Sequence, residues 1–121
     1  MAQQIVDSHG QIPQQIIIDT DALATKITNV IGTSGTLYLI DFNNLRGTHA
    51  VLKLYDAAEV AVGTTAPDWT VDAAASARVV VSIPEGFAFT NLSYATVTVP
   101  GTAGVTSPSG GSAATLRLVI R

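Results

Sequence analysis

Short stretches of alternating apolar and polar residues, separated by glycine or proline, are the feature that most limits how this chain can fold. Val, Ile and Thr favour extended backbone. The recurring Gly and Pro interrupt the helical segments of about 10 to 15 residues that a βαβ fold would need. The pattern instead predicts about seven or eight short strands. We therefore expect an all-β protein, an antiparallel β-sandwich or a jelly roll, with an extended N-terminal arm.

The character of individual strands can be read from which positions are apolar. Both faces of residues 36–42 are apolar, which predicts a central strand covered on both sides. Residues 93–99 alternate strictly, which is typical of a half-exposed strand. The segment Pro84-Glu85-Gly86 should end the strand before it, because proline cannot donate to a ladder and glycine suits a turn. The clearest strand patterns occupy residues 14–19, 36–42, 50–56, 78–83, 93–99 and 114–121.

The length of 121 residues fits one domain. We expect the sandwich to occupy residues 23–121, and residues 1–22, with Gly10 and Pro13, to form an N-terminal arm or an edge segment. Residues 100–113 are rich in Gly, Thr, Ser and Pro and are long for a hairpin loop. Such loops are commonly either mobile or in contact with a partner.

Charged residues are scarce in this chain. Asp, Glu, Lys and Arg make up 12% and hydrophobic residues 47%, whereas soluble domains contain about 25% charged residues. A small domain leaves much of its surface outside its core, so the low charge predicts that part of the surface is covered by other proteins. The net charge is −3 and the six Lys and Arg are scattered along the chain. We therefore expect no binding to nucleic acid.

No combination of residues makes a persuasive catalytic or metal site. Asp7-Ser8-His9 contains the residue types of a hydrolytic triad, but alternation in an extended segment points Ser8 away from its two neighbours. His9 and His49, in a chain without cysteine, make a poor zinc site. Asp19 and Asp21 supply too few oxygens for calcium. We expect no enzymatic activity, no cofactor and no metal.

The chain shows no signal for export or membrane insertion. Its first residues, Met1–Asp7, contain neither the basic nor the apolar region of a secretory signal. No apolar stretch approaches the roughly 20 residues of a membrane helix. The absence of cysteine excludes disulfides and agrees with assembly in a reducing cytoplasm.

Carbohydrate binding is an alternative function, because sugars bind to exposed aromatic faces. Phe42, Phe87 and Phe89 fit positions in the core or at its edge, and Trp69 fits an anchor for the loop after Pro67. Tyr38, Tyr55 and Tyr94 lie in strand patterns, where packing in the core is the more common role. A small carbohydrate-binding module therefore stays open as an alternative.

Several motifs follow one another in a characteristic order between residues 36 and 121. They are Leu52–Asp56, Val62–Thr64, Pro67–Thr70, Pro84–Phe89, Tyr94–Thr98 and Gly101–Gly104, with a strand at the end. In this order and spacing they resemble small virion structural proteins of tailed bacteriophages. The resemblance is nearest to capsid decoration (cement) proteins.

The resemblance implies a noncatalytic β-sandwich subunit on the capsid exterior, assembled in the host cytoplasm. The implied partners are the major capsid protein and further copies of this chain, as a homotrimer that bridges neighbouring capsid proteins. A neck, tail or fibre-base component is the alternative within this class. The N-terminal arm and the 100–113 loop are the candidate contact segments. The candidate interface residues are Gln3, Gln4, Ile5, Val6, Ile12, Gln14, Thr102, Val105, Thr106 and Ser107.

Overall fold

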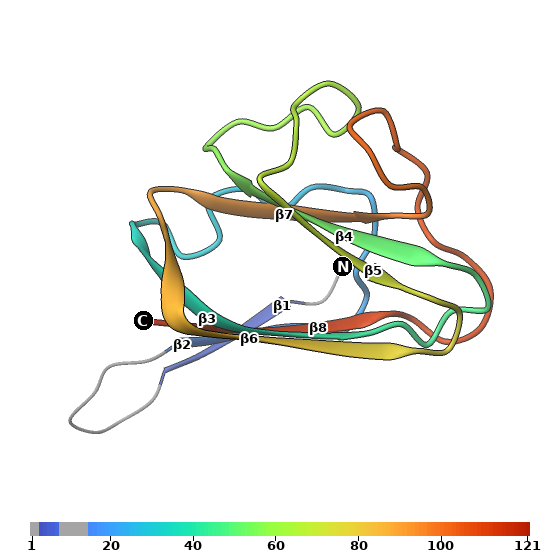
Figure 1. Ribbon diagram of the computed structural model, residues 1–121, viewed down its shortest axis with the longest axis horizontal. Helices are drawn as coiled ribbons and strands as arrows, with labels where there is room; N and C mark the ends of the chain where they lie inside the picture. Colours follow the sequence, from blue (N-terminus) through green and yellow to red (C-terminus); the bar gives the residue numbers. More distant parts are fainter. Residues whose placement is uncertain (1–2, 8–14) are drawn as a thin grey trace.

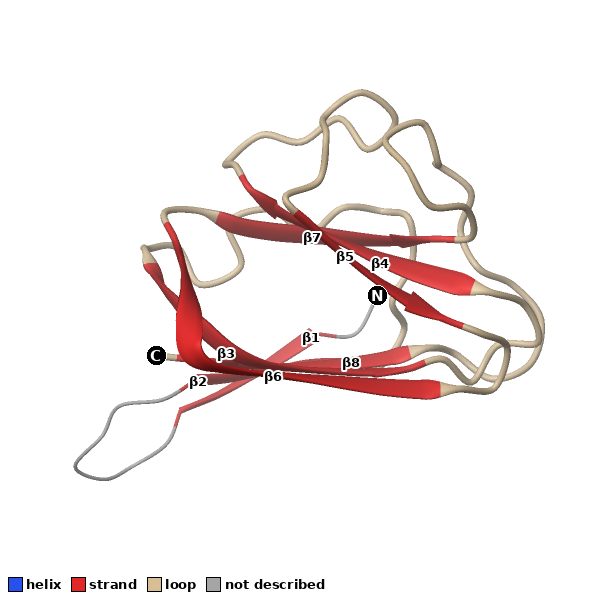
Figure 2. Ribbon diagram, viewed as in Figure 1, coloured by secondary structure: helices blue, strands red, loops and turns tan. Residues whose placement is uncertain are grey.

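The computed structural model describes residues 3–7 and 15–121, and within them it contains strands but no helix (Figure 2). Among these residues there is accordingly no helix long and apolar enough to cross a membrane. The strands are β1 (Gln3–Asp7), β2 (Gln15–Asp19), β3 (Gly35–Asn43), β4 (Ala50–Asp56), β5 (Trp69–Ala73), β6 (Arg78–Phe89), β7 (Leu92–Val97) and β8 (Thr115–Ile120).

The strands form two sheets that pack face to face (Figure 1). Sheet A has the order β1-β2-β8-β3-β6, and sheet B has the order β5-β4-β7. All neighbouring strands are antiparallel. The predicted antiparallel β-sandwich is therefore confirmed. In Figure 1 sheet A is the lower layer and sheet B the upper one.

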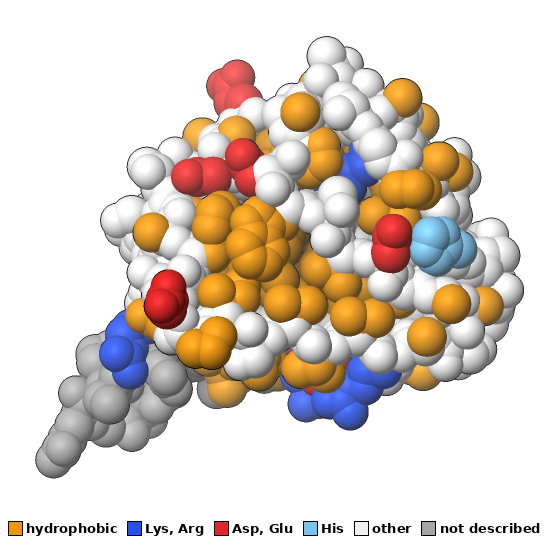
Figure 3. Space-filling view, viewed as in Figure 1, with side chains coloured by type: hydrophobic (Ala, Val, Ile, Leu, Met, Phe, Trp, Pro, Cys, Tyr) orange, Lys and Arg blue, Asp and Glu red, His pale blue; other side chains and the backbone are white. Residues whose placement is uncertain are grey.

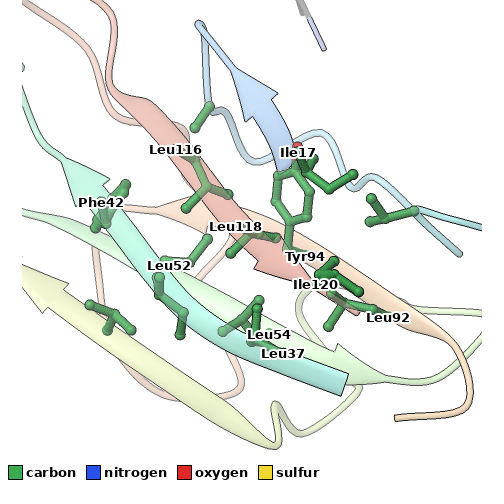
Figure 4. Close-up of a cluster of buried hydrophobic side chains, with 14 of the residues drawn as sticks. Ile17, Leu37, Phe42, Leu52, Leu54, Leu92, Tyr94, Leu116, Leu118 and Ile120 are labelled. Carbon is green, nitrogen blue, oxygen red and sulfur yellow. The ribbon is translucent and has the colours of Figure 1, made fainter. Parts of the chain in front are cut away.

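Alternate residues of both sheets point inward and form one hydrophobic core (Figure 4). β8 shows the predicted alternation, because Leu116 and Leu118 are fully buried while Arg117 between them is exposed. Each such buried leucine stabilises the fold by about 1.5–3 kcal/mol. The large side chains at the centre of the core are Ile17, Leu37, Ile40, Phe42, Leu52, Leu54, Leu92, Tyr94, Leu116, Leu118 and Ile120.

The N-terminal segment is partly built into this core. Within β2, between β1 and β8, Ile17 and Asp19 are fully buried. The Asp19 carboxylate accepts a hydrogen bond of 2.7 Å from the hydroxyl of Tyr94 on β7. Burial, together with this hydrogen bond, raises the pKa of Tyr94, so the hydroxyl keeps its proton. Of residues 1–22, predicted as an arm or an edge segment, residues 15–22 thus belong to the sandwich, and β1 forms an edge of sheet A.

The prediction that Pro84-Glu85-Gly86 ends a strand is wrong. β6 continues to Phe89, because residues 83–86 form a bulge opposite Tyr38. Gly86 has a φ of 78°, and a Cβ there would lie 2.3 Å from the Thr36 methyl group. Glycine therefore allows the bulged strand to approach β3, and pairing with β3 resumes beyond it.

Two predictions about the outer faces of strands are also wrong, in opposite directions. β3 was expected to be covered on both faces, but its outward residues, such as Leu39, are only half-buried. β7 was expected to be half-exposed, but all its residues are buried. The sandwich therefore has one outer face that is covered and one that is open.

Candidate functional site

Over β4 and β7 the outer face of sheet B is covered by the chain's own loops. Residues 57–68 and 98–106 fold over it and form a third layer, visible at the top of Figure 1. Tyr55, Val60 and Ala95 make a small second hydrophobic cluster beneath this layer. The outward side chains of β4 and β7 are buried in this way without any partner protein.

Lys53 holds the two loops together. Its ammonium group, on the outer face of β4, donates to the carbonyl oxygens of Val62 at 3.3 Å, Thr102 at 3.1 Å and Gly104 at 2.8 Å. The side chain is fully buried, and this burial lowers the pKa of Lys53. Carbonyl groups bind a cation through their dipoles, so Lys53 serves as a fixed internal link.

The predicted contact residues of the 100–113 loop take part in this third layer. The Thr102 carbonyl accepts from Lys53, and the Thr106 carbonyl accepts from the Thr98 amide at 2.9 Å. The Ser107 hydroxyl accepts from the Ala24 amide at 2.8 Å. The Val105 side chain is 56% exposed. The loop thus contacts its own chain, and its role in binding a partner stays a prediction.

The predicted contact residues near the N-terminus lie on β1 or beyond the described region. Gln3, Gln4, Ile5 and Val6 lie on β1, whose backbone pairs with β2. The predicted contact residues Ile12 and Gln14, and the rejected triad residues Ser8 and His9, lie outside the described residues.

The outer face of sheet A has no such cover among the described residues. The strand register places Ile16, Val119 and Leu39 side by side in one row across β2, β8 and β3. The next row contains Ile18, Arg117, Asp41 and Val80. We call this surface the open sheet face, defined by Ile16, Ile18, Leu39, Asp41, Arg78, Val80, Arg117 and Val119.

A shallow hollow of about 220 Å³ lies in the open sheet face. Its polar centre is an ion pair in which the Arg78 guanidinium donates to both carboxylate oxygens of Asp41, at 2.8 and 2.7 Å. These hydrogen bonds hold the pKa of Asp41 below its usual range. Arg117 stands directly opposite Asp41 on the neighbouring strand. The hollow is lined by Ile18, Thr20, Asp41, Asn43, Arg78, Thr115 and Arg117.

Three of the six basic residues of the chain gather on this side of sheet A. Arg78 and Arg117 line the hollow, and Arg121 lies over the ring of Tyr38 at 5.7 Å from its centre. In Figure 3 most of the Lys and Arg atoms accordingly lie along the lower side, and most Asp and Glu atoms lie higher. Sequence reasoning missed this cluster because it depends on the strand order.

Few aromatic side chains are available for a sugar. Tyr55 and Tyr94 are fully buried. Trp69 and Phe87 are half-buried and pack against each other, with ring centres 5.1 Å apart. The half-buried Tyr38 lies beneath Arg121. Tyr38, Trp69 and Phe87 are therefore the partly exposed aromatic groups that a bound sugar could contact.

A second hollow, of about 570 Å³, opens beside Lys26 and Glu59. The Lys26 ammonium donates to the Val60 carbonyl, so it is already bound within the protein. Among the described residues no three His, Cys, Asp or Glu side chains are grouped closely enough to hold a metal ion. Neither this hollow nor the distribution of these side chains points to a catalytic site among the described residues.

No protein-family model, curated protein or solved structure matches this chain.

Proposed function

We propose that this protein is a noncatalytic virion structural subunit, a capsid decoration (cement) protein. It acts on the exterior of the shell, where it bridges copies of the major capsid protein and associates with further copies of itself as a homotrimer. The resemblance of residues 36–121 to such proteins is one support. The other is the open sheet face.

The open sheet face is the observation that carries the proposal. On this face, half-buried branched side chains from neighbouring strands of one sheet lie beside arginines. Apolar area flanked by Arg is typical of protein interfaces, which are depleted in Lys and Glu. In this account the face lies against the capsid protein, and binding to several neighbours at once strengthens weak single contacts.

A matched pair of surface variants tests this surface. Val80, on the open sheet face, is 52% exposed, and Val99, beyond β7, is 57% exposed. Because both are exposed, replacing either with Gln should leave the fold intact. We expect Val80→Gln to weaken co-sedimentation with shells assembled without this protein about tenfold. Val99→Gln should bind as the wild type does.

Two results would contradict the proposed function. One is a protein that stays monomeric in size-exclusion chromatography with light scattering and does not bind shells. The other is binding confined to one vertex or to purified tails, which would favour the neck, tail or fibre-base alternative. Binding to a glycan array that Trp69→Ala abolishes would favour the carbohydrate-binding alternative.

A further inference from the structure

In the hollow of the open sheet face, Arg78 and Asp41 are paired with each other by two hydrogen bonds. The two groups form a bidentate pair, with the Arg78 Nε on one carboxylate oxygen and Nη2 on the other. This geometry fixes the Arg78 guanidinium against the sheet. Arg78 reaches Asp41 from β6, and the charge of Arg117 on β8 also helps to lower the pKa of Asp41.

Arg117 has no such partner among the described residues. Its side chain is exposed, and it makes no hydrogen bond or ion pair with any described side chain or carbonyl. It nevertheless stands on β8, between β2 and β3, so its base is held by a rigid sheet. Thr20, Asn43 and Thr115 line the same hollow. Guanidinium, hydroxyl and amide groups can all donate to an anion.

The net charge of the side chains that line the hollow is positive by one, which matches a single anion. Arg78 and Arg117 contribute two positive charges and Asp41 one negative charge. We propose that the hollow accepts one carboxylate, from an Asp or Glu side chain of the partner protein, with Arg117 as the bidentate donor. The apolar residues of the open sheet face surround this contact and exclude water from it, which strengthens a charge-assisted hydrogen bond.

The surroundings favour an acidic protein surface over a nucleic acid. A nucleic acid presents a continuous row of phosphates and needs a basic stripe to match it. Here Asp41 lies at the centre of the arginines, and the whole chain carries a net charge of −3. One carboxylate surrounded by apolar surface fits the hollow and its rim. The inference rests on the proposed function, because it names the chemistry of the capsid surface.

Three variants test the site in the shell-binding assay. Arg117→Gln should weaken binding about tenfold, because a hydrogen-bonded charge at an interface is lost. Arg117→Lys should bind at an intermediate level, since Lys keeps the charge but not the bidentate geometry. Arg121→Gln removes the same charge beside Tyr38 and should stay within about twofold of the wild type. Equal losses for Arg117→Gln and Arg121→Gln, or no loss for Arg117→Gln, would overturn the inference.

A direct probe separates this inference from the proposed function. The free protein is titrated with N-acetyl-glutamate α-amide, and the Arg117 Nε–H resonance is followed by NMR at constant ionic strength. A saturable shift that N-acetyl-glutamine amide does not cause supports the site even if shells do not bind. No shift, or stronger binding of inorganic phosphate or of a short single-stranded DNA at Arg117, would overturn it. If wild type and Arg117→Gln bind shells equally, the proposed function stands and the carboxylate site is rejected.

Discussion

The two outer faces of this sandwich differ in how their apolar side chains are covered. Each sheet carries apolar residues on its outer side as well as toward the core. On sheet B the chain covers these residues with its own loops and links the loops through Lys53. On sheet A the described residues leave the outer face open, with arginines beside the apolar rows.

The comparison separates two causes of the low charge of this chain. Part of the low proportion of charged residues is explained by the fold itself, because a third layer buries residues that a two-layer sandwich would expose. Another part belongs to the open sheet face, where the apolar residues have no cover among the described residues. The low charge alone therefore overstates how much surface is available for partners, and the open sheet face is one part of the surface that remains available.

The largest effect is expected from removing the charge that links the loops. Lys53→Met keeps an unbranched apolar side chain up to Cε but leaves the carbonyls of Val62, Thr102 and Gly104 without their donor. We expect the free energy of unfolding to fall by about 3 kcal/mol, as measured by urea denaturation. Amide hydrogen exchange should accelerate in residues 57–68 and 98–106.

Arg117→Met is the matched control, since it removes a basic group from the open sheet face. Because Arg117 is exposed and makes no bond to a described residue, its loss should change stability by less than about 0.5 kcal/mol. Equal losses of stability for Lys53→Met and Arg117→Met would contradict the view that only the face of sheet B is held together by a buried basic group.

A smaller loss is expected from a methyl group added inside the third layer. A Cβ at Gly104 would lie 2.2 Å from the carbonyl oxygen of Val99. Gly104→Ala should therefore destabilise the protein by about 1–3 kcal/mol. A Cβ at Gly47 would meet no atom within 4 Å. Gly47→Ala should accordingly leave the thermal midpoint nearly unchanged, and a similar shift for both would show that the layer is not tightly packed.

The row of apolar residues on the open sheet face should matter more for assembly than for folding. Ile16 and Val119 face each other across β2 and β8 and are both half-buried. Replacing both with Thr keeps β-branched side chains, so we expect a loss of only about 1 kcal/mol in stability. Binding to shells should fall by more than about tenfold. Unchanged binding would exclude this row from the interface.

The smallest effect concerns the Asp41–Arg78 pair. Because Arg78 lowers the pKa of Asp41 from its usual 3.8, the pair stabilises the fold above that pH and loses this contribution as the pH falls through the lowered pKa. Asp41→Asn should lower the stability only slightly, since Arg78 is exposed and solvent screens the pair. In thermal melts the gap between wild type and variant should be constant above about pH 5 and close in more acidic buffer. A gap that widens on acidification would contradict this assignment.

Much of the fold could be predicted from local patterns. The alternation around Leu118 places β8, and the bounds of β4 agree with the predicted 50–56. The coverage of β7 could not be predicted, because the loops that bury it follow from long-range contacts such as that of Lys53 with Gly104. For the same reason the arginine cluster appears only once the strand order places β6, β3 and β8 side by side.

The central proposal is that sheet A, in place of the loop layer predicted from the sequence, faces the capsid protein. Hydroxyl-radical footprinting with mass spectrometry, on the free protein and on shell-bound protein, tests it directly. Ile16, Ile18, Leu39 and Val119 should be oxidised in the free protein and protected on the shell. The exposed Val99 and Val105 should react equally in both states. Protection of Val99 and Val105 with continued oxidation of the four residues on sheet A would contradict the account.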